Sequence, residues 1–491
     1  MIALSAAQLL PMDHNIAMPS YDRNQLSPGI VHIGLGNFHR AHQAWYLHRL
    51  FAQGLDTDWA IVGAGVRAYD TQMREKIKAN DCLTTLIAVE ATGASVEVIG
   101  SMIDYVAVEQ DNAALIKQMA DPAIRIVALT VTEGGYYLDP ASQQFDHKHP
   151  DIQHDAAYPD KPKTSFGAII AALNLRRDHN LGPFTGLSCD NLRGNGNILR
   201  QTLLSLARLS DPALADWIAQ QCTFPNSMVD CIVPATGERE IALAQSFGMN
   251  DPIPVTHERF RQWIIEDKFC AGRPAWDKVG ATFTDHVHDY ENMKIRILNG
   301  GHQLIAQIGD LLGIKTIAAS MQHEKIHAMF RKIELEEIAP HVKAVPEFTA
   351  QAYVDVIDQR FSNPAIVDTT RRVAFDGSSR HPGFVIPSIR DGLAQATPVD
   401  GLAFISAIWA RYCLGIREDG SQIEANDPCW QTLQATAKAA KARPMAWLEM
   451  TPIYGDLAQY ASFAASFEKW LMQIHAKGVL ATLDAYLSDN H

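Results

Sequence analysis

The 491-residue sequence has no excess of basic residues and no long apolar run. Its 55 acidic residues outnumber its 42 lysines and arginines, so the formal net charge is −13. Such a charge argues against nucleic acid or an anionic membrane as the main partner. No segment is apolar for long enough to span a bilayer, and no basic residue precedes Arg23, as a signal peptide would require. The sequence therefore predicts a cytoplasmic protein that binds neither nucleic acid nor a membrane.

Paired cysteines are also absent. The seven cysteines are odd in number and scattered, without a Cys-x-x-Cys pair, which favours reduced thiols over a disulfide framework or a zinc site. Two close histidine pairs, His39 with His42 and His286 with His288, have no third ligand at a supporting spacing. We therefore expect no metal ion.

Length and the order of apolar segments predict two domains. A chain of 491 residues exceeds what one hydrophobic core usually serves. Up to about residue 285, apolar strand candidates alternate with helical segments, which is typical of a parallel sheet covered by helices. The predicted fold class is α/β, with a Rossmann-type domain over residues 1–285 and a mostly α-helical domain over residues 286–491. In the second domain, helices are expected over 291–312, 323–340, 348–360, 401–415, 430–450 and 465–488.

Four strand candidates define the first domain. Polar residues end two of them: Thr132 and Glu133 close the third candidate, and Asp190 and Asn191 close the fourth. Ligands of open parallel sheets bind at the carboxyl edge, so these side chains predict one crevice. The four candidates cover residues 30–34, 59–66, 124–135 and 184–191, and helical spacing of apolar residues from 41 to 51 follows the first of them.

The segment VHIGLGNFHRAH, residues 31–42, contains part of a dinucleotide-binding fingerprint. Gly34 and Gly36 follow a strand and open a helix, where the first provides a tight turn and the second lets the backbone approach a pyrophosphate. His39 stands where a third glycine is usual, and Arg40 adds a cation that can hydrogen-bond to phosphate. Ordinary strand–helix turns also carry two glycines, but the context favours a cofactor loop.

Asp70 supplies the acidic residue that is expected after the second strand. An acid at this position accepts hydrogen bonds from an adenosine ribose and repels a 2′-phosphate, which favours NAD over NADP. Arg67 lies nearby in the sequence and argues mildly in the opposite direction. We also assign Phe38, Thr132 and Asp230 to the cofactor site.

A second informative stretch, ENMKIRILNGGHQLIAQIG, covers residues 291–309. Two glycines inside a helix cost about 1 kcal/mol each relative to alanine, so some close approach should require Gly300 and Gly301. At about 100° per residue, His302 lies roughly 80° and Asn299 roughly 140° around the helix axis from Lys294. This polar arc on an otherwise apolar helix predicts a site facing a cleft, although a solvated lysine on an amphipathic helix is the alternative for Lys294 alone.

The same residues fit the oxidation of an alcohol by a nicotinamide. A lysine with a lowered pKa can remove the hydroxyl proton as a general base while the hydride leaves. The amides of Asn191 and Asn299 can stabilise the developing alkoxide, and His302 can hydrogen-bond to a substrate hydroxyl. This chemistry requires no metal.

Several motifs together resemble those of the polyol-specific long-chain dehydrogenases. The resemblance runs in order from about residue 20 to beyond residue 420, so it is far more specific than any single motif. The motifs are VHIGLGNFHRAHQAWYLHRL, TVTEGGYY, SCDNLRGNG, TFPNSMVD, EDKFCAGRPAWDKVG, KIRILNGGH and RFSNPAIVDTTRRVAFDGSSR.

The resemblance implies an NAD-dependent enzyme with a catalytic lysine at Lys294. It also implies an oxyanion hole formed by Asn191 and Asn299, and substrate binding by His302. Glu291 matches a glutamate linked to proton passage. Substrate contacts are expected from Arg372, Arg380 and Glu133.

Two positions depart from the family pattern. Cys231 follows MVD where the family has an arginine, so a charge is missing. Arg380 stands where the family has a lysine. The planar guanidinium of arginine differs in shape from the compact ammonium group of lysine, so the substrate pocket can have a different shape.

The resemblance leaves the substrate open. Interconversion of D-mannitol and D-fructose is the leading expectation, and oxidation of D-arabinitol to D-xylulose is close behind. Fructuronate reduction is third, because Arg372 and Arg380 can hold a carboxylate. A non-catalytic NAD-binding sensor is the alternative from another class, and Cys231 alone supports it. The similarity in length to monomeric family members predicts a monomer.

Overall fold

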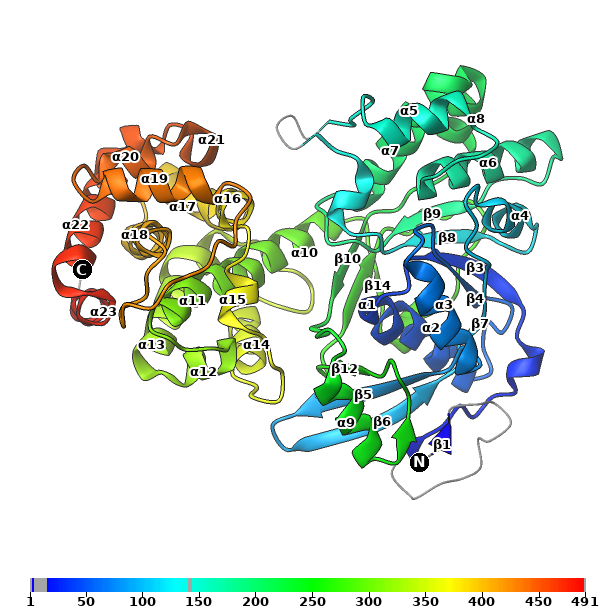
Figure 1. The fold of residues 1–491 in the computed structure, drawn as a ribbon, viewed down its shortest axis with the longest axis horizontal. Helices are drawn as coiled ribbons and strands as arrows, with labels where there is room; N and C mark the ends of the chain where they lie inside the picture. Colours follow the sequence, from blue (N-terminus) through cyan, green and yellow to red (C-terminus); the bar gives the residue numbers. More distant parts are fainter. Residues whose placement is uncertain (1, 4–15, 140–143, 490–491) are drawn as a thin grey trace. The chain divides into compact units, whose positions relative to one another are not determined.

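The computed structural model describes residues 2–3, 16–139 and 144–489, and it divides into two compact units, Met1–His288 and Asp289–His491. The first unit is built around a parallel sheet, and the second unit is mostly helical (Figure 1). This arrangement confirms the predicted fold class.

The central sheet of the first unit has five parallel strands in the order β7-β4-β3-β8-β9. The chain runs outward from β3 to one side through β4 and β7 and then returns to the other side through β8 and β9. The order therefore reverses between β3 and β8, which is where open α/β sheets bind ligands. The strands are β3 (Pro28–Ile33), β4 (Ala60–Ala64), β7 (Met102–Tyr105), β8 (Ile126–Leu129) and β9 (Thr185–Ser188).

Helices cover both faces of this sheet (Figure 1). Successive side chains of a strand point to opposite faces, so Ile30 packs into one core with α2, and Val31 packs into the other core with α4, α6 and α7. Burial on both faces explains why β3, β4 and β8 carry apolar residues on both faces rather than in strict alternation. The helices of this unit are α1 (Asn37–Ala41), α2 (Gln43–Ala52), α3 (Asp70–Ala79), α4 (Ala113–Ala120), α5 (Pro150–Ala157), α6 (Ser165–Asp178), α7 (Asn195–Ser210), α8 (Pro212–Gln221) and α9 (Glu238–Ser246).

All four predicted strands are confirmed: three are shorter than expected, and the first begins two residues before its predicted start and ends one residue before its predicted end. Three smaller sheets are not among the predicted elements, because most of their strands have only two to four residues. A four-stranded sheet has the order β12-β5-β6-β2, a three-stranded sheet the order β10-β13-β14, and β1 pairs with β11. Their strands are β1 (Ile2–Ala3), β2 (Ile16–Ala17), β5 (Thr84–Glu90), β6 (Gly93–Ile99), β10 (Ser227–Asp230), β11 (Met249–Asn250), β12 (Val255–His257), β13 (Gln262–Ile265) and β14 (Thr282–Phe283).

The second unit differs from the predicted helices at several points, among them an unpredicted helix over Ile386–Gln395. The predicted helix over 430–450 ends at Ala440, and the one over 465–488 is broken at Gly478, whose φ of +83° is outside the helical range. Three segments are π-helical: Lys294–Asn299, Glu334–Ile338 and His381–Val385. The α-helices are α10 (Val287–Met293), α11 (Gly300–Leu311), α12 (Ile317–Gln322), α13 (Glu324–Ile333), α14 (Ala350–Phe361), α15 (Thr370–Val373), α16 (Gly377–Arg380), α17 (Ile386–Gln395), α18 (Asp400–Tyr412), α19 (Trp430–Ala440), α20 (Met445–Leu448), α21 (Thr451–Tyr454), α22 (Ala461–Lys477) and α23 (Val479–Ser488).

None of the helices in the described ranges combines the length and the apolar composition that crossing a membrane needs.

Candidate active site

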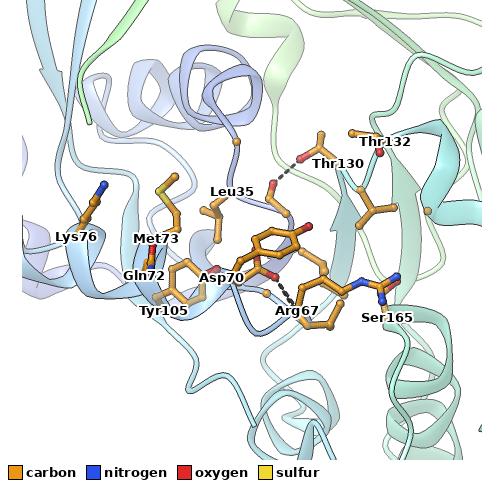
Figure 2. A pocket seen from close by; sticks show the side chains of 18 of the residues that line it. Leu35, Arg67, Asp70, Gln72, Met73, Lys76, Tyr105, Thr130, Thr132 and Ser165 are labelled. Atoms are coloured by element: carbon orange, nitrogen blue, oxygen red, sulfur yellow. Dashed lines mark hydrogen bonds between the residues drawn. The ribbon is translucent and has the colours of Figure 1, made fainter. Parts of the chain in front are cut away.

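A pocket of about 470 Å³ lies at the carboxyl edge of the central sheet in the first unit. It is lined by the turns after β3, β4 and β8 and by one face of α3. Figure 2 shows Asp70 and Tyr105 on one side of this pocket, with Thr130 and Thr132 on the other. The position matches the reversal of strand order, as the physics of open parallel sheets predicts.

The two glycines of the first turn have different roles: Gly34 allows the backbone conformation of the turn, and Gly36 leaves open space beside the pocket. Gly34 has a φ of +93°, and a Cβ on it would lie 2.1 Å from the carbonyl oxygen of Thr130, so only glycine fits. The Thr130 hydroxyl also donates to the carbonyl of Gly34 at 2.5 Å, which fixes the turn. Gly36 is exposed, and a Cβ there would meet no atom within 4 Å. The space beside Gly36 therefore belongs to the pocket, and a dinucleotide fits against its bare backbone.

The position of the usual third glycine is filled by a buried histidine. His39 is 1% exposed and stacks on His32 of β3, with ring centroids 3.5 Å apart. Burial holds the pKa of both imidazoles well below the usual value, so they are neutral at physiological pH. The helix is interrupted at His42, where α1 ends and α2 begins. A close histidine stack thus replaces the close helix–strand contact that glycine provides elsewhere.

Arg40 does not reach the pocket, contrary to the phosphate contact predicted from the sequence. Its side chain is 1% exposed and donates to the carbonyl of Ile253 at 2.6 Å and to the Asn37 side chain at 2.7 Å. The guanidinium is therefore a structural link between α1 and the segment before β12. Phe38 also lies outside the pocket lining, stacked on His42 with the ring centroids 4.9 Å apart.

Asp70 lines the pocket at the first turn of α3. Its Oδ2 accepts hydrogen bonds from the backbone N–H groups of Val66 at 3.0 Å and Arg67 at 2.8 Å. Among the described residues, no hydrogen-bonding partner engages its other oxygen, Oδ1. The carboxylate is therefore held in one orientation by its own turn, with one oxygen left to accept a ribose hydroxyl.

Arg67 also lines the pocket, but its guanidinium is engaged by two other groups. It donates to the Tyr137 hydroxyl at 3.0 Å and lies 3.7 Å from the Asp151 carboxylate. The pKa of Arg67 is raised, since its interactions with Tyr137 and Asp151 outweigh partial burial. These contacts draw the cation to the far side of the pocket from Asp70.

The turn after β8 contains a strained residue. Thr132 has φ +66° and ψ +164°, a region that costs a β-branched residue about 1–3 kcal/mol. The carboxylate of Asp190, at the end of β9, accepts the N–H of Thr132 at 2.7 Å and that of Val131 at 3.2 Å. Glu133 begins the short 3-10 helix that follows, and its side chain lies outside what the structure describes.

Two further residues of the first unit stand apart from this pocket lining. Asn191 directly follows Asp190 and is exposed. Asp230 ends β10 in the three-stranded sheet and is 4% exposed. The structure thus brings together Gly34, Gly36, Asp70 and Thr132 of the predicted cofactor residues, whereas Phe38, Arg40 and Asp230 lie elsewhere.

The second unit carries Lys294 at the start of a π-helical segment that joins α10 to α11. Lys294 is 8% exposed and Glu291 is 4% exposed, so Lys294 is not a solvated surface lysine. The angular positions predicted at 100° per residue are wrong here, because i→i+5 hydrogen bonding makes each residue turn through less than 100°. Asn299 is five positions after Lys294 and therefore comes closer to its face than an α-helix would place it.

The predicted close approach at the glycine pair is confirmed. A Cβ on Gly300 would lie 3.3 Å from the Phe384 carbonyl oxygen, and one on Gly301 would lie 2.9 Å from Glu334 and from Phe330. Glu334 is fully buried, and neither of its carboxyl oxygens has a hydrogen-bonding partner among the described residues. Burial raises its pKa well above the usual value, which favours the neutral acid.

His302 lies beside a cluster of charged residues. Its ring stacks on Phe361 with centroids 4.1 Å apart, and its Nε2 lies 3.9 Å from the carboxylate of Asp368. Burial lowers the pKa of His302 to about 4; Asp368 raises it, while Arg372 and Arg380 are among the cations that lower it. The imidazole is therefore neutral, and it can donate a hydrogen bond to a hydroxyl or accept one from it. Arg380 donates to the carbonyl of Val373 at 2.7 Å.

Sequence reasoning missed Asp368 as part of this cluster. Its carboxylate accepts two hydrogen bonds from Arg372, at 2.7 and 2.6 Å. The two residues are four apart in the sequence, but Asp368 precedes α15, which begins at Thr370, so helical spacing alone does not reveal the pair. Within the described ranges, no group of three His, Cys, Asp or Glu residues gathers closely enough to hold a metal ion.

The glycine turn, the acidic residue after the second strand and the pocket at the strand reversal define a Rossmann-type dinucleotide-binding protein. Its second unit adds a buried lysine, which Asn299 and His302 follow in the sequence. Residues 28–278 match the family model described as the mannitol dehydrogenase Rossmann domain, and residues 286–475 match the mannitol dehydrogenase C-terminal domain. The chain belongs to the mannitol dehydrogenase family, which confirms the resemblance seen in its motifs.

Similar proteins cover the whole chain. Mannitol 2-dehydrogenase of Cereibacter sphaeroides is 54% identical over 477 residues, which is 97% of this chain and all of that protein. Mannitol 2-dehydrogenase of Pyricularia oryzae is 39% identical over 484 residues, covering 97% and 96% of the two chains.

Two solved structures have the same fold. One is Pseudomonas fluorescens mannitol 2-dehydrogenase in a ternary complex with NAD and D-mannitol, with a TM-score of 0.87, 38% identity and coverage of 97% and 98%. The other is a substrate-free D-sorbitol dehydrogenase, with a TM-score of 0.91, 34% identity and coverage of 98% and 100%.

Proposed function

We propose that this protein is an NAD-dependent mannitol 2-dehydrogenase that interconverts D-mannitol and D-fructose. The observation that carries the proposal is a buried lysine on a π-helical segment, with Asn299 and His302 following it, in a chain that also holds a glycine-turn pocket with an acidic residue. The 54% identity over nearly the whole chain to a mannitol 2-dehydrogenase supports the choice of polyol.

The proposed reaction converts a polyol and NAD⁺ to a ketose, NADH and a proton. The cofactor, when bound, accepts the hydride from the carbon that carries the reacting hydroxyl. In the first unit, the bare backbone at Gly36 would hold the pyrophosphate, and Asp70 would accept the ribose hydroxyls. The contacts that hold Arg67 away from Asp70 and the charge of Asp70 both favour NAD over NADP.

The second unit supplies the base in this proposal. Lys294 takes the hydroxyl proton, and Asn191 and Asn299 donate hydrogen bonds to the oxygen as its charge develops. Glu291, buried one turn before Lys294, would pass the proton onward. Neutral His302 would hydrogen-bond to a second hydroxyl.

Substrate contacts beyond the reacting carbon are assigned to Arg372, Arg380 and Glu133. Guanidinium groups donate several hydrogen bonds, which suits a substrate with a hydroxyl on every carbon. The Cys231 departure lies at a buried position, with its Sγ 3.9 Å from the carbonyl of Glu258. A thiol is therefore accommodated at this buried position.

D-sorbitol is the second candidate substrate, favoured by the TM-score of 0.91 to a D-sorbitol dehydrogenase. Oxidation of D-sorbitol at carbon 2 also gives D-fructose, because the two polyols differ only in configuration at that carbon. The substrate pocket must therefore distinguish the orientation of a single hydroxyl.

The deciding experiment follows NADH formation at mildly alkaline pH with D-mannitol, D-sorbitol, D-arabinitol and D-mannonate, each with NAD and with NADP. We expect the highest kcat/KM for D-mannitol with NAD. Preference for D-sorbitol or D-arabinitol would replace the substrate within the same chemistry. Turnover of D-mannonate alone would make the two arginines a carboxylate clamp. NAD binding without any turnover would support the sensor alternative.

We also propose that the enzyme acts as a monomer in the cytoplasm. All seven cysteines are free thiols in the structure, which suits a reducing compartment. Light scattering coupled to size-exclusion chromatography tests the first part: a mass close to 54.2 kDa is expected, and twice that mass would contradict it.

A further inference from the structure

One carboxylate holds the turn after β8 at both of its ends. Oδ1 and Oδ2 of Asp190 accept the N–H groups of Thr132 and Val131 at 2.7 and 3.2 Å, at the beginning of the turn. The Tyr136 hydroxyl, at the end of the turn, donates to Oδ2 at 2.8 Å. Asp190 is 7% exposed and Tyr136 is fully buried, so water does not compete for these bonds.

The turn needs such a restraint because Thr132 is strained. Its φ of +66° with ψ of +164° belongs to a region that residues other than glycine rarely occupy. A conformation of this kind persists only where the surroundings over-determine it. The short bond from Thr132 N–H to an ionised acceptor provides that determination, since charge-assisted hydrogen bonds are the strong ones.

The restrained turn is a wall of the cofactor pocket. Val131, Thr132 and Gly135 all line the pocket, whereas Asp190 itself does not. Asp190 also begins the segment that presents Asn191, the amide assigned to the developing alkoxide. A further bond, from the Asn195 side chain to the Asp190 carbonyl at 3.0 Å, fixes the backbone at this point.

We propose that Asp190 is a positioning residue for the reaction. Its carboxylate keeps Thr132 in its strained conformation at the wall of the cofactor pocket. This inference rests on the proposed function, because it assigns the pocket to NAD.

The test replaces Asp190 with asparagine and measures NADH affinity by fluorescence titration, together with kcat and Tm. The amide of D190N has only one acceptor oxygen, so at least one of the three donors loses its partner. The loss of one charge-assisted hydrogen bond corresponds to about a tenfold change in equilibrium constant. We expect the Kd for NADH to rise at least about tenfold and kcat to fall.

A matched control separates positioning from general stability. Asp251 is a buried carboxylate of the same unit that also accepts three hydrogen bonds, from Asn80, Thr85 and Ile253, and none of these four residues lines the pocket. Asp251→Asn should lower Tm about as much as Asp190→Asn while leaving the Kd for NADH within about twofold of the wild type.

Two further variants keep the inference testable if D190N does not fold. Tyr136→Phe removes only the bond at the end of the turn and should raise the Kd for NADH about threefold. Thr132→Gly in the D190N background relieves the strain, since glycine adopts positive φ freely, and should recover part of the lost affinity.

The outcomes distinguish this inference from the proposed function. An unchanged Kd for NADH in both D190N and Y136F overturns the inference, as does an equal loss of affinity in D251N. Absence of polyol turnover by the wild type, with NADH binding intact, overturns only the proposed function. Absence of NADH binding by the wild type overturns both.

Discussion

The guanidinium of Arg372 lies against the carboxylate of Asp368, with two parallel hydrogen bonds of 2.7 and 2.6 Å. The two side chains differ in environment: that of Asp368 is 6% exposed and that of Arg372 is 65% exposed. The buried acid therefore orients a cation whose other face is open to solvent. His302, 3.9 Å from the same acid, lies on its inner side. Asp368 thus connects the two residues that are assigned to substrate hydroxyls.

Replacing Asp368 with asparagine should weaken polyol binding more than catalysis. The guanidinium of Arg372 would lose one of its two acceptor oxygens and become mobile. We therefore expect the KM for the polyol to rise about tenfold and kcat to change less than about threefold. His302 stays neutral in this variant, because its pKa is lowered mainly by burial and loses only a raising influence. The kcat pH profile should therefore not move.

The matched control for this experiment is Asp355→Asn. Asp355 pairs with Arg331 at 3.0 Å in the same unit, away from His302. Its replacement should leave the KM for the polyol unchanged. A KM unaffected in D368N, or raised equally in both variants, would mean that Arg372 does not bind substrate through this arrangement.

Lys294→Met should abolish most of the turnover without affecting the cofactor. The methionine side chain retains the length and apolar packing of the lysine stem and removes the amine. General-base catalysis contributes about 10²–10⁴-fold to a rate, so kcat should fall by that factor. NADH titration should give an unchanged Kd, because the pocket lies within the first unit. A kcat within tenfold of the wild type would remove Lys294 from the proposed mechanism.

Much of this site could be predicted from the sequence, because its signals are local. Each signal lies within a few residues of the sequence: the glycine turn, the acid at Asp70 and the glycine pair that follows Lys294. The positions of the other side chains depend on contacts with residues that are distant in the sequence. Arg40 has the charge for a phosphate, but a carbonyl two hundred residues away, that of Ile253, takes its guanidinium.

The role of Asp190 illustrates the same limit. Its position at the end of a strand was visible in the sequence, but its three donors come from a turn that precedes it by more than fifty residues. The π-helical hydrogen bonding at Lys294 likewise has no signature in apolar spacing. The angle predicted between Asn299 and Lys294 rests on α-helical geometry and is therefore too large for this segment.

Gly34 and Gly36 should respond to substitution in opposite ways. Gly34→Ala forces a Cβ to within 2.1 Å of a carbonyl oxygen at positive φ, so we expect a lower Tm and loss of folded protein. Gly36 has φ −71° and ψ 177°, which any residue adopts, and open space beside it. Gly36→Val should keep its Tm within about 2 °C and raise the Kd for NADH at least about tenfold. Equal NADH affinity in Gly36→Val and the wild type would place the cofactor elsewhere.

Asp70→Asn should relax the preference for NAD. The asparagine oxygen can still accept the N–H groups of Val66 and Arg67, so the turn is kept while the charge is lost. A unit charge about 4 Å from a 2′-phosphate is worth about 1–4 kcal/mol between water and a protein surface. We therefore expect kcat/KM with NADP to rise at least about tenfold relative to NAD. An unchanged ratio would show that shape rather than charge excludes the phosphate.

Mild acid should affect the two units unequally, because their buried titratable groups differ. In the first unit, burial lowers the pKa of His32, His48 and His257 to about 3 and that of His39 well below its usual value. The unfolded chain binds protons at these histidines near pH 6.5 and the folded unit does not, so stability is lost as the pH falls below that value. Each such group contributes a slope of about 1.4 kcal/mol per pH unit.

In the second unit, two acids oppose the histidines. Burial lowers the pKa of His302 to about 4 and of His381 to about 3, but it raises that of Glu337 to about 7 and that of Glu334 well above its usual value. The folded unit binds protons at these acids that the unfolded chain releases above pH 4.5, so acidification adds stability there. The two effects have opposite signs and similar slopes between pH 7 and pH 5.

Calorimetry between pH 7.5 and pH 5.0 should therefore show an unfolding transition of the first unit that moves to lower temperature, while that of the second unit moves less. Replacing Glu337 with glutamine removes one opposing proton and should make the second transition acid-sensitive as well. Ordinary carboxylates do not interfere, because they titrate below this window. Two transitions that shift in parallel in the wild type would contradict this prediction. They would show that the titratable groups buried in the two cores make the same contribution to the pH dependence of stability.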